Sequence, residues 1–193
     1  MNPNPGRGQP ARERLMKAAA ELFYSQGIAA TGIDSITQKA GVARKSLYNN
    51  FASKNDLVFA YIQERHQEWL DLYELQASKA ESPRGLVLAV FDAYIDHANA
   101  AYIHGFRGCG LLNVAAELPA GAPGRLAVRE HKEQVESILN TKLAMIFPSD
   151  RAAELAEQLA FVLEGAVARA GLEGSASRLV QARKIAASLV DAA

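Results

Sequence analysis

The chain has one cysteine, no long hydrophobic run and no net charge. The single Cys109 cannot form an intramolecular disulfide, which fits a reducing cytoplasm. No stretch approaches the roughly 18 uncharged apolar residues that a membrane span needs, so we expect a cytoplasmic protein with no membrane partner. Alternating β patterns are absent as well. With 49% hydrophobic residues, the 193-residue chain can still bury a sizeable core.

What remains is a helical pattern, which predicts an all-α protein of about nine helices. Apolar residues recur at helical spacing, alanine and leucine dominate, and glycine and proline separate the segments. Ser53 and Ser82 are placed as N-caps of two long helices. Beyond position 53 we expect helices at about 54–80, 83–101, 111–117, 125–146, 150–170 and 176–191.

The window of residues 15–57 carries the clearest functional signal. Its first helix has a single apolar stripe. Thr31 and Asp34 are spaced like a capping box that starts a second helix, which Gly41 ends. A third helix, roughly 43–50, follows at once. Two short helices joined by a turn of three or four residues containing glycine form a helix-turn-helix, whose second helix enters the major groove of DNA.

The third predicted helix packs Leu47 and Phe51 inward and leaves a polar face free. We expect the hydroxyl of Tyr48, with Lys54 nearby, to hold a phosphate, and neighbouring side chains to read base edges. The whole expected DNA-binding set is Thr31, Thr37, Ala43, Arg44, Lys45, Ser46, Tyr48, Asn49, Asn50 and Lys54. Two alternatives stay open: Arg44 and Lys45 touch only phosphates, or the polar face is merely solvated.

Charge favours DNA binding over a solvated face. The chain has 21 basic and 21 acidic residues, but residues 1–56 hold eight basic and four acidic side chains. The N-terminal part therefore carries a formal charge of +4 and the remainder −4. Such a split fits a head that binds nucleic acid on a body that does not.

The same window resembles a known family. The run AAAELFYSQGIAATGIDSITQKAGVARKSLYNNFASKNDL closely resembles the N-terminal DNA-binding domain of TetR/AcrR-type transcriptional repressors. The residues that match are Ala19, Ala20, Leu22, Phe23, Gly27, Thr31, Ile36, Ala40, Gly41, Val42, Leu47, Tyr48, Phe51, Ser53, Lys54 and Leu57. Gln38 departs from the pattern, and Arg44 and Lys45 stand where many members have a neutral residue and glycine. The operator sequence therefore cannot be transferred from a relative.

The resemblance implies three parts. Residues 1–10, polar and without an apolar core, are expected as a flexible arm and not as a signal peptide. Residues 11–56 form the helix-turn-helix domain, and residues 57–193 form a helical ligand-binding and dimerisation domain. A homodimer is expected to bind a palindromic double-stranded DNA operator, with the last two helices of each subunit forming a four-helix bundle across the two-fold axis.

Apolar stripes on the last two helices supply the expected dimer contacts. These are Leu155, Leu159, Val162, Leu163, Ala166, Leu179, Ala186, Leu189 and Val190. Small residues among them permit close approach of the helices. The competing interpretation is that each stripe packs within its own subunit.

The segment 91–113 mixes aromatic residues with histidine, cysteine and glycine. The resemblance implies a body that binds a small-molecule inducer, and a mostly apolar lining predicts a hydrophobic or aromatic one. The expected lining is Trp69, Tyr73, Phe91, Tyr94, His97, Tyr102, Cys109, Leu112, Asn113 and Phe161. Ordinary core aromatics are the competing interpretation.

Two other functions compete with a ligand-responsive repressor. A small helical enzyme would need Cys109 with His97 or His104 as a nucleophilic pair, and a DNA-binding protein could work without an inducer. A lone cysteine is more often a small buried hydrophobe, and the scattered histidines lack the spacing of a zinc site. We therefore expect a ligand-responsive repressor with no catalytic residue, no metal and no cofactor.

Overall fold

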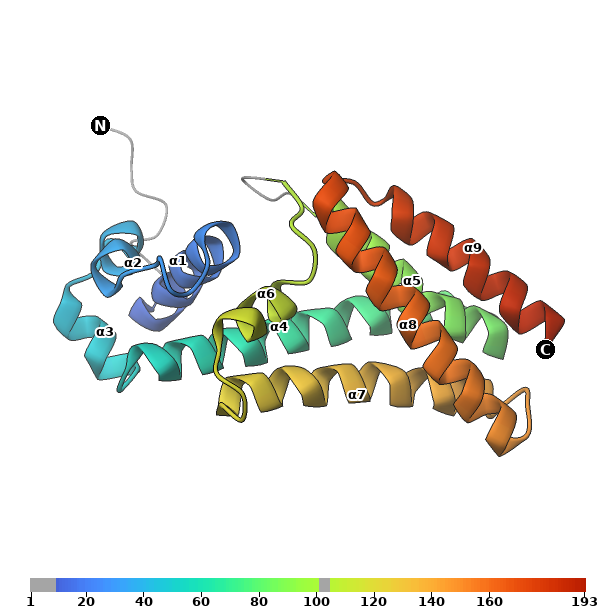
Figure 1. Ribbon diagram of the computed structural model, residues 1–193. Coiled ribbons are helices and arrows are strands. Elements are labelled where there is room, and N and C mark those ends of the chain that lie inside the picture. The colour runs from blue at the N-terminus through green and yellow to red at the C-terminus, as the bar shows by residue number, and fades with distance from the viewer. Residues whose placement is uncertain (1–9, 101–104) are drawn as a thin grey trace.

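The computed structural model describes residues 10–100 and 105–193, and within them it consists of nine helices and no strand (Figure 1). The helices are α1 (Ala11–Gln26), α2 (Ile33–Ala40), α3 (Arg44–Asn50), α4 (Lys54–Ala77), α5 (Pro83–Asn99), α6 (Gly110–Glu117), α7 (Pro123–Leu143), α8 (Ser149–Glu173) and α9 (Ser177–Ala192). The all-α prediction is confirmed. The predicted arm up to position 9, Tyr102 and His104 lie outside the described residues.

Capping decides where several helices begin. The hydroxyls of Ser53 and Ser82 each accept a hydrogen bond from the backbone N–H three residues on, as predicted. The predicted cap at Thr31 is wrong, because Gly32 precedes α2 and provides no side chain. The hydroxyl of Thr31 instead donates to the carbonyl of Gly27 (2.6 Å). Thr31 therefore closes the loop between α1 and α2 rather than starting a helix.

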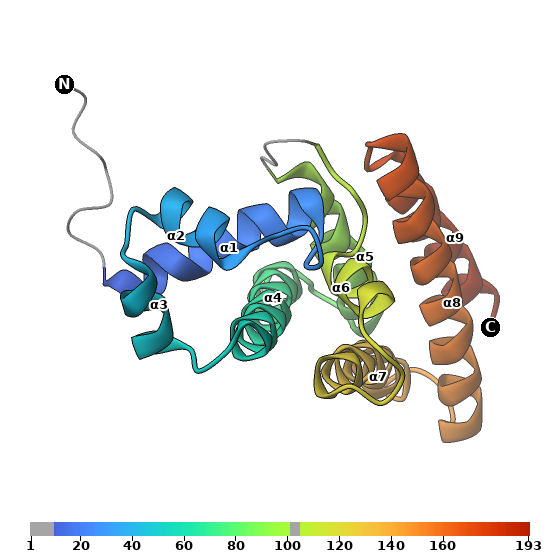
Figure 2. The same ribbon diagram turned by 60° about the vertical axis from the view of Figure 1, so that its left-hand side comes forward.

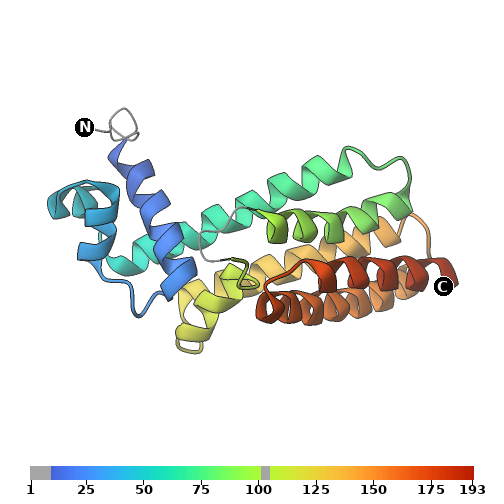
Figure 3. The ribbon, with the colours of Figure 1, turned by 90° about the horizontal axis from the view of Figure 1, so that it is seen from above.

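The helices form a small head at one end and a longer body. Figure 1 shows α1, α2 and α3 gathered at the N-terminal end, with α4 leading from them into the body. Within the body, α4 and α7 run side by side along much of its length, and α5 lies between α4 and the last two helices (Figures 1 and 3). The pair α8 and α9 covers the side of the body away from α4, as Figures 2 and 3 show.

Two apolar clusters hold the chain together, and α4 belongs to both. The body cluster takes Trp69 and Tyr73 from the second half of α4, together with α5, α8, α9 and the end of α7. The head cluster takes Leu57 and Tyr61 from the first half of α4 and also includes residues of α6 and the start of α7. The head therefore packs on the body through α4 and α6, across the predicted boundary at residue 56.

Candidate DNA-binding face and ligand pocket

A tight turn sets the angle between α2 and α3. Gly41 has φ 63° and ψ 39°, a left-handed conformation that glycine adopts without strain. The N–H of Val42 donates to the carbonyl of Thr37 (3.1 Å) and completes the turn. Leu47, fully buried, and Phe51 then fix α3 against the head. The turn and these two anchors give α3 one buried side and one side turned to solvent.

The solvent side of α3 carries the polar residues that the sequence singles out. Lys45 and Asn49 are exposed, and 45% of Tyr48 is accessible. The guanidinium of Arg44 lies 3.1 Å from a carboxylate oxygen of Asp34 and 5.9 Å from the centre of the Tyr48 ring. Exposed pairs of this kind contribute little to stability. Arg44 can therefore leave Asp34 for a stronger acceptor, such as a phosphate or a guanine edge, at small cost.

Three residues of the expected DNA-binding set have other partners. Thr31 and Thr37 are buried, and their hydroxyls bond carbonyl oxygens inside the head, so the prediction that they contact DNA is wrong. The ammonium of Lys54 donates to the carbonyl of Ile28 and ties the start of α4 to the loop between α1 and α2. Ser46 is half-buried, while Ala43 and Asn50 are exposed beside it. The accessible set is therefore smaller than the sequence predicts.

A cavity of about 720 Å³ lies between head and body, and we call it the pocket. Its wall comes from the end of α1, from one face of α4, from α5 and from the start of α6, with single residues of α2, α7 and α8. Of the predicted lining, four residues take part: Trp69, Tyr94, His97 and Cys109. The position of the pocket matters because its wall joins the two parts of the molecule.

Five predicted lining residues lie elsewhere. Phe91 and Tyr73 pack inside the body core. Leu112 is exposed on α6, and Asn113, one residue further on, donates to the carbonyl of Arg107 outside the cavity. Phe161 is 69% exposed on the outer side of α8. For Phe91 and Tyr73 the aromatic spacing reports core packing, as the competing interpretation held.

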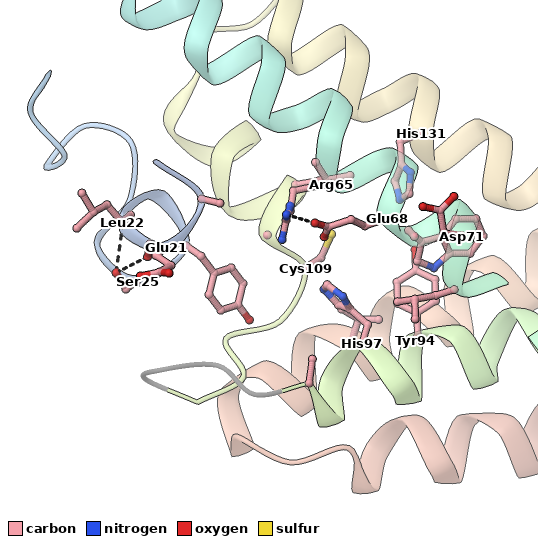
Figure 4. Close-up of a pocket in the computed structure, with 18 of the residues that line it drawn as sticks. Glu21, Leu22, Ser25, Arg65, Glu68, Asp71, Tyr94, His97, Cys109 and His131 are labelled. Carbon is pink, nitrogen blue, oxygen red and sulfur yellow. Dashed lines mark hydrogen bonds and ion pairs between the residues drawn. The ribbon is translucent and has the colours of Figure 1, made fainter. Parts of the chain in front are cut away.

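Apart from His97, the acidic and basic side chains of the wall were not predicted from the sequence. Arg65 and Glu68 form an ion pair that projects from α4 toward Cys109 and His97, as Figure 4 shows. His131 of α7 contributes as well, and its Nδ1 lies 2.8 Å from Nδ1 of His66. A signal was available, since positions 65, 68, 69 and 72 follow helical spacing and so share one face of α4 with the tryptophan.

Burial controls the ionisation of the histidines in the wall. It lowers the pKa of His97 to about 4, and the positive charges of Arg65 and Lys132 act in the same direction. It likewise lowers the pKa of His131 to about 3, again with Lys132 contributing. Both imidazoles are therefore neutral near pH 7. Burial also raises the pKa of the Glu68 carboxyl, against the opposing effect of Arg65.

Polar contacts at both ends of α6 attach the head to the body, and we call them the α6 clamp. At the C-terminal end, the carboxylate of Glu117 accepts hydrogen bonds from the N–H groups of Ile28 (3.0 Å) and Ala29 (2.7 Å). Gly27 makes this approach possible, because a Cβ there would lie 2.5 Å from a Glu117 oxygen. The loop that follows α1 is thus fixed to the last residue of α6.

At the other end of the α6 clamp, Arg107 precedes α6 and reaches the last turn of α1. Its guanidinium donates to the carbonyls of Tyr24 (2.7 Å) and Ser25. The Tyr24 hydroxyl accepts from the N–H of Arg107 (2.6 Å) and donates to the carbonyl of Gly108 (3.2 Å). Because Tyr24 and Cys109 both line the pocket, the clamp and the pocket share a wall.

The predicted dimer contacts are mostly inside the subunit. Leu155, Leu159, Leu163, Leu179, Ala186 and Val190 are buried in the body core, so the prediction that they form an interface is wrong. Val162, Ala166 and Leu189 are half-buried. Phe161 and Leu172 (85% accessible) are instead exposed on the side of α8 opposite its buried stripe, and Val180 and Ile185 are exposed on α9. We call these four residues the outer apolar face.

Comparison with known proteins identifies the family. Residues 15–61 match the model of the bacterial regulatory proteins of the tetR family. A solved TetR transcriptional regulator from Streptomyces avermitilis is 31% identical, with a TM-score of 0.77 over 95% of this chain and 99% of that one. The chain belongs to the TetR family. A solved TetR-family regulator from Streptomyces coelicolor is 28% identical, with a TM-score of 0.81 over 94% and 93% of the two chains.

Curated members of the TetR family are similar over a shorter stretch. The transcriptional activator FasR of Mycolicibacterium smegmatis is 36% identical over 96 residues, 47% of this chain and 43% of FasR. The transcriptional repressor KstR2 of Mycobacterium tuberculosis is 32% identical over 103 residues, 51% of this chain and 50% of KstR2. The matched part of the chain thus spans about half the length of these relatives. They regulate transcription in opposite directions.

The chain accordingly belongs to a family of transcriptional regulators, and the relatives and solved neighbours named here are regulators by their descriptions. Within the described residues, no helix is long and apolar enough to cross a membrane. No group of three or more His, Cys, Asp or Glu side chains there could hold a metal ion.

Proposed function

We propose that this TetR-family regulator is a homodimeric repressor that binds a palindromic operator and leaves it when a small apolar molecule fills the pocket. The observation that carries the proposal is the position of the pocket. Its wall contains the end of α1 from the head and faces of α4 and α5 from the body. A molecule that fills the pocket therefore contacts both parts and can change the angle between them.

DNA contacts are proposed for the solvent side of α3. Arg44, Lys45 and Asn49 face the bases, and Tyr48 holds a phosphate, which sets the position of the head on DNA but not the sequence it selects. One helix of seven residues covers few base pairs. Two copies related by a two-fold axis read two half-sites, about 34–36 Å apart along the DNA.

The outer apolar face supports the homodimer. Its four large apolar side chains lie on neighbouring helices and remain accessible in the single subunit. Pairing of two such faces across a two-fold axis removes them from water and forms a four-helix bundle. We expect Phe161→Glu to turn the dimer into a monomer and to weaken operator binding strongly. Light scattering on the purified variant measures this, with Met145→Glu, at an exposed apolar residue of the loop between α7 and α8, as the matched control.

Release is proposed to follow from a preference of the ligand for one head position. A ligand that binds both positions equally shifts nothing, whatever its affinity. A ligand that separates the end of α1 from α4 strains the α6 clamp, and the two α3 helices then leave the spacing that the operator requires. Operator affinity measured with and without a bound ligand tests this step. A pocket ligand that leaves operator affinity unchanged would reject release and favour a DNA-binding protein without an inducer.

A further inference from the structure

The guanidinium of Arg44, at the start of α3, is held by a residue from outside that helix. Its Nη1 lies 3.1 Å and 3.4 Å from the two carboxylate oxygens of Asp34, in the first turn of α2. The Tyr48 hydroxyl is near enough to raise the pKa of Arg44, as Asp34 also does, but no hydrogen bond joins it to the guanidinium. Arg44 and Asp34 are 60% and 80% accessible, so packing inside the head does not fix either side chain. The ion pair therefore orients the guanidinium.

The ion pair occupies only one part of the guanidinium. Asp34 takes Nη1, and neither Nε nor Nη2 donates a hydrogen bond within the part of the chain that the structure describes. The Nε–H and one N–H of Nη2 are parallel, and such an edge can bind two acceptors at once. O6 and N7 of guanine present that pair of acceptors in the major groove. Arg44 can therefore bind a guanine and keep its contact with Asp34.

The positions of the two residues in the helix-turn-helix suit this arrangement. In such a motif the start of the second helix contacts base edges, and the first helix crosses the DNA backbone. Arg44 is the first residue of α3, and Asp34 is the second residue of α2. Both helices lie at the end of the head away from the body (Figures 1 and 2). A head docked in this way brings Arg44 to the bases and Asp34 to the neighbouring backbone.

The carboxylate of Asp34 disfavours a second way of binding DNA. Non-specific binding consists of contacts with phosphates. If Arg44 moves to a phosphate, Asp34 is left unpaired beside a negatively charged backbone, and like charges placed together oppose binding. If Arg44 binds a guanine, the pair remains, and the exclusion of water strengthens its attraction. Asp34 therefore makes phosphate contact by Arg44 less favourable than guanine contact.

We propose that Asp34 is a specificity-determining residue of this regulator, because it positions Arg44 to read a guanine in each half-site and disfavours contact of Arg44 with phosphate. Asp34 touches no base, so it is a positioning residue that acts through Arg44. The inference rests on the proposed function of α3 in DNA binding. It extends the determinants of sequence preference from α3 to α2.

The first experiment finds the operator position that Arg44 reads. Wild type and Arg44→Lys each select bound sequences from a pool of random DNA duplexes. Lysine keeps the charge but lacks the planar pair of donors, so a guanine selected by wild type should lose its advantage at that position. Four duplexes that differ only in the base at that position are then compared by fluorescence anisotropy at fixed salt. Wild type should prefer guanine by roughly tenfold or more, as a bidentate contact does.

Substitution of Asp34 tests its role on the same four duplexes. Asp34→Ala should reduce the guanine preference by roughly threefold or more and should bind the other three duplexes at least as tightly as wild type does. Asp34→Glu keeps a carboxylate and should retain part of the preference. The matched control is Glu13→Ala, which removes an exposed carboxylate from the first turn of α1 and should keep the wild-type preference.

A double variant shows whether Asp34 acts through Arg44. In the Arg44→Lys background, Asp34→Ala should leave the base preference unchanged, because the donor pair that Asp34 positions is absent. A purely structural role of Asp34 at the start of α2 predicts a different result. Asp34→Ala would then weaken binding to all four duplexes alike in both backgrounds, and that result would overturn the proposal.

The outcomes separate this inference from the proposed function. If wild type selects no common sequence, both fail. If Arg44→Lys loses a guanine preference that Asp34→Ala retains, DNA recognition by α3 stands and the role of Asp34 is rejected. The role of Asp34 is likewise rejected if Arg44→Lys changes the preference at no position, or if the base preferred at the affected position is not guanine.

Discussion

The face of α3 and the wall of the pocket both carry polar side chains, which are exposed to solvent on α3 and more deeply buried in the pocket. On α3 the basic side chains are exposed and weakly paired, so they are available to a partner. In the pocket, burial shifts the pKa of His97, His131 and Glu68, and the buried indole N–H of Trp69 has no hydrogen-bond partner among the described residues. Binding at the first surface should therefore depend on salt, and binding at the second on desolvation.

Replacing the proposed base-reading residues of α3 should weaken operator binding without affecting the pocket. A good base contact contributes about 1–3 kcal/mol, so Arg44→Ala, Lys45→Ala and Asn49→Ala together should weaken operator binding by roughly 100-fold or more. Fluorescence anisotropy with labelled operator at fixed salt measures this. Arg129→Ala removes an exposed body charge and serves as the control. Unchanged base preference after all three substitutions would remove α3 from sequence recognition.

Lowering the pH should destabilise the folded protein through the neutral histidines of the pocket wall. The folded-state pKa values of His97 and His131 lie below their ordinary value, so the unfolded chain binds more protons as the pH falls from about 6.5 toward 4. The stability they contribute is present above pH 6.5 and is lost through this window. We expect a loss of roughly 3–4 kcal/mol between pH 7 and pH 5 from the two together.

Urea unfolding of wild type and His131→Gln at pH 7 and pH 5 isolates that effect. The variant should lose less stability on acidification than wild type, by roughly half of the histidine contribution. The comparison of the two proteins cancels the carboxylates that titrate in both. An identical pH dependence in wild type and variant would show that His131 is not held neutral by the fold.

Breaking the α6 clamp should weaken the coupling between the pocket and the DNA-binding face of α3. Glu117→Ala leaves the N–H groups of Ile28 and Ala29 without their acceptor, which we expect to cost about 1 kcal/mol because the site is partly exposed. Pocket affinity should remain, but a pocket ligand should change operator affinity less than it does in wild type. Glu130→Ala, an exposed carboxylate of α7, is the control. Full retention of the ligand effect would show that coupling follows another route, such as α4.

The smallest effect is expected from Tyr48→Phe. One hydrogen bond to a phosphate contributes about 0.5–1.5 kcal/mol, so binding should weaken roughly three- to tenfold on every sequence alike. Affinities for the operator and for two operators with single substitutions measure this. A changed preference among the three would place the Tyr48 hydroxyl on a base instead.

The sequence predicts the head more completely than the pocket, for a physical reason. The turn at Gly41 and the anchors Leu47 and Phe51 lie within one short window, where spacing alone determines which side is buried. The pocket brings together α1, α4, α5, α6 and α7, and Arg65 and His131 have no common local pattern. The predicted dimer contacts on α8 were wrong because the stripe that packs inside the subunit is also apolar. Spacing alone cannot tell which apolar stripe packs against the subunit's own core.

Because α4 belongs to both apolar clusters, it limits how the heads of regulators can be exchanged. The ring of Phe23 in α1 meets that of Tyr61 in an edge-on contact (5.6 Å between centres), and the same cluster includes Leu111 and Val128 from further along the chain. A chimaera joined at residue 56 would give a transplanted head a foreign α4 and α6 to pack against. Head exchange between regulators should therefore succeed only when the donor's matching residues on α4, α6 and α7 are transplanted with the head.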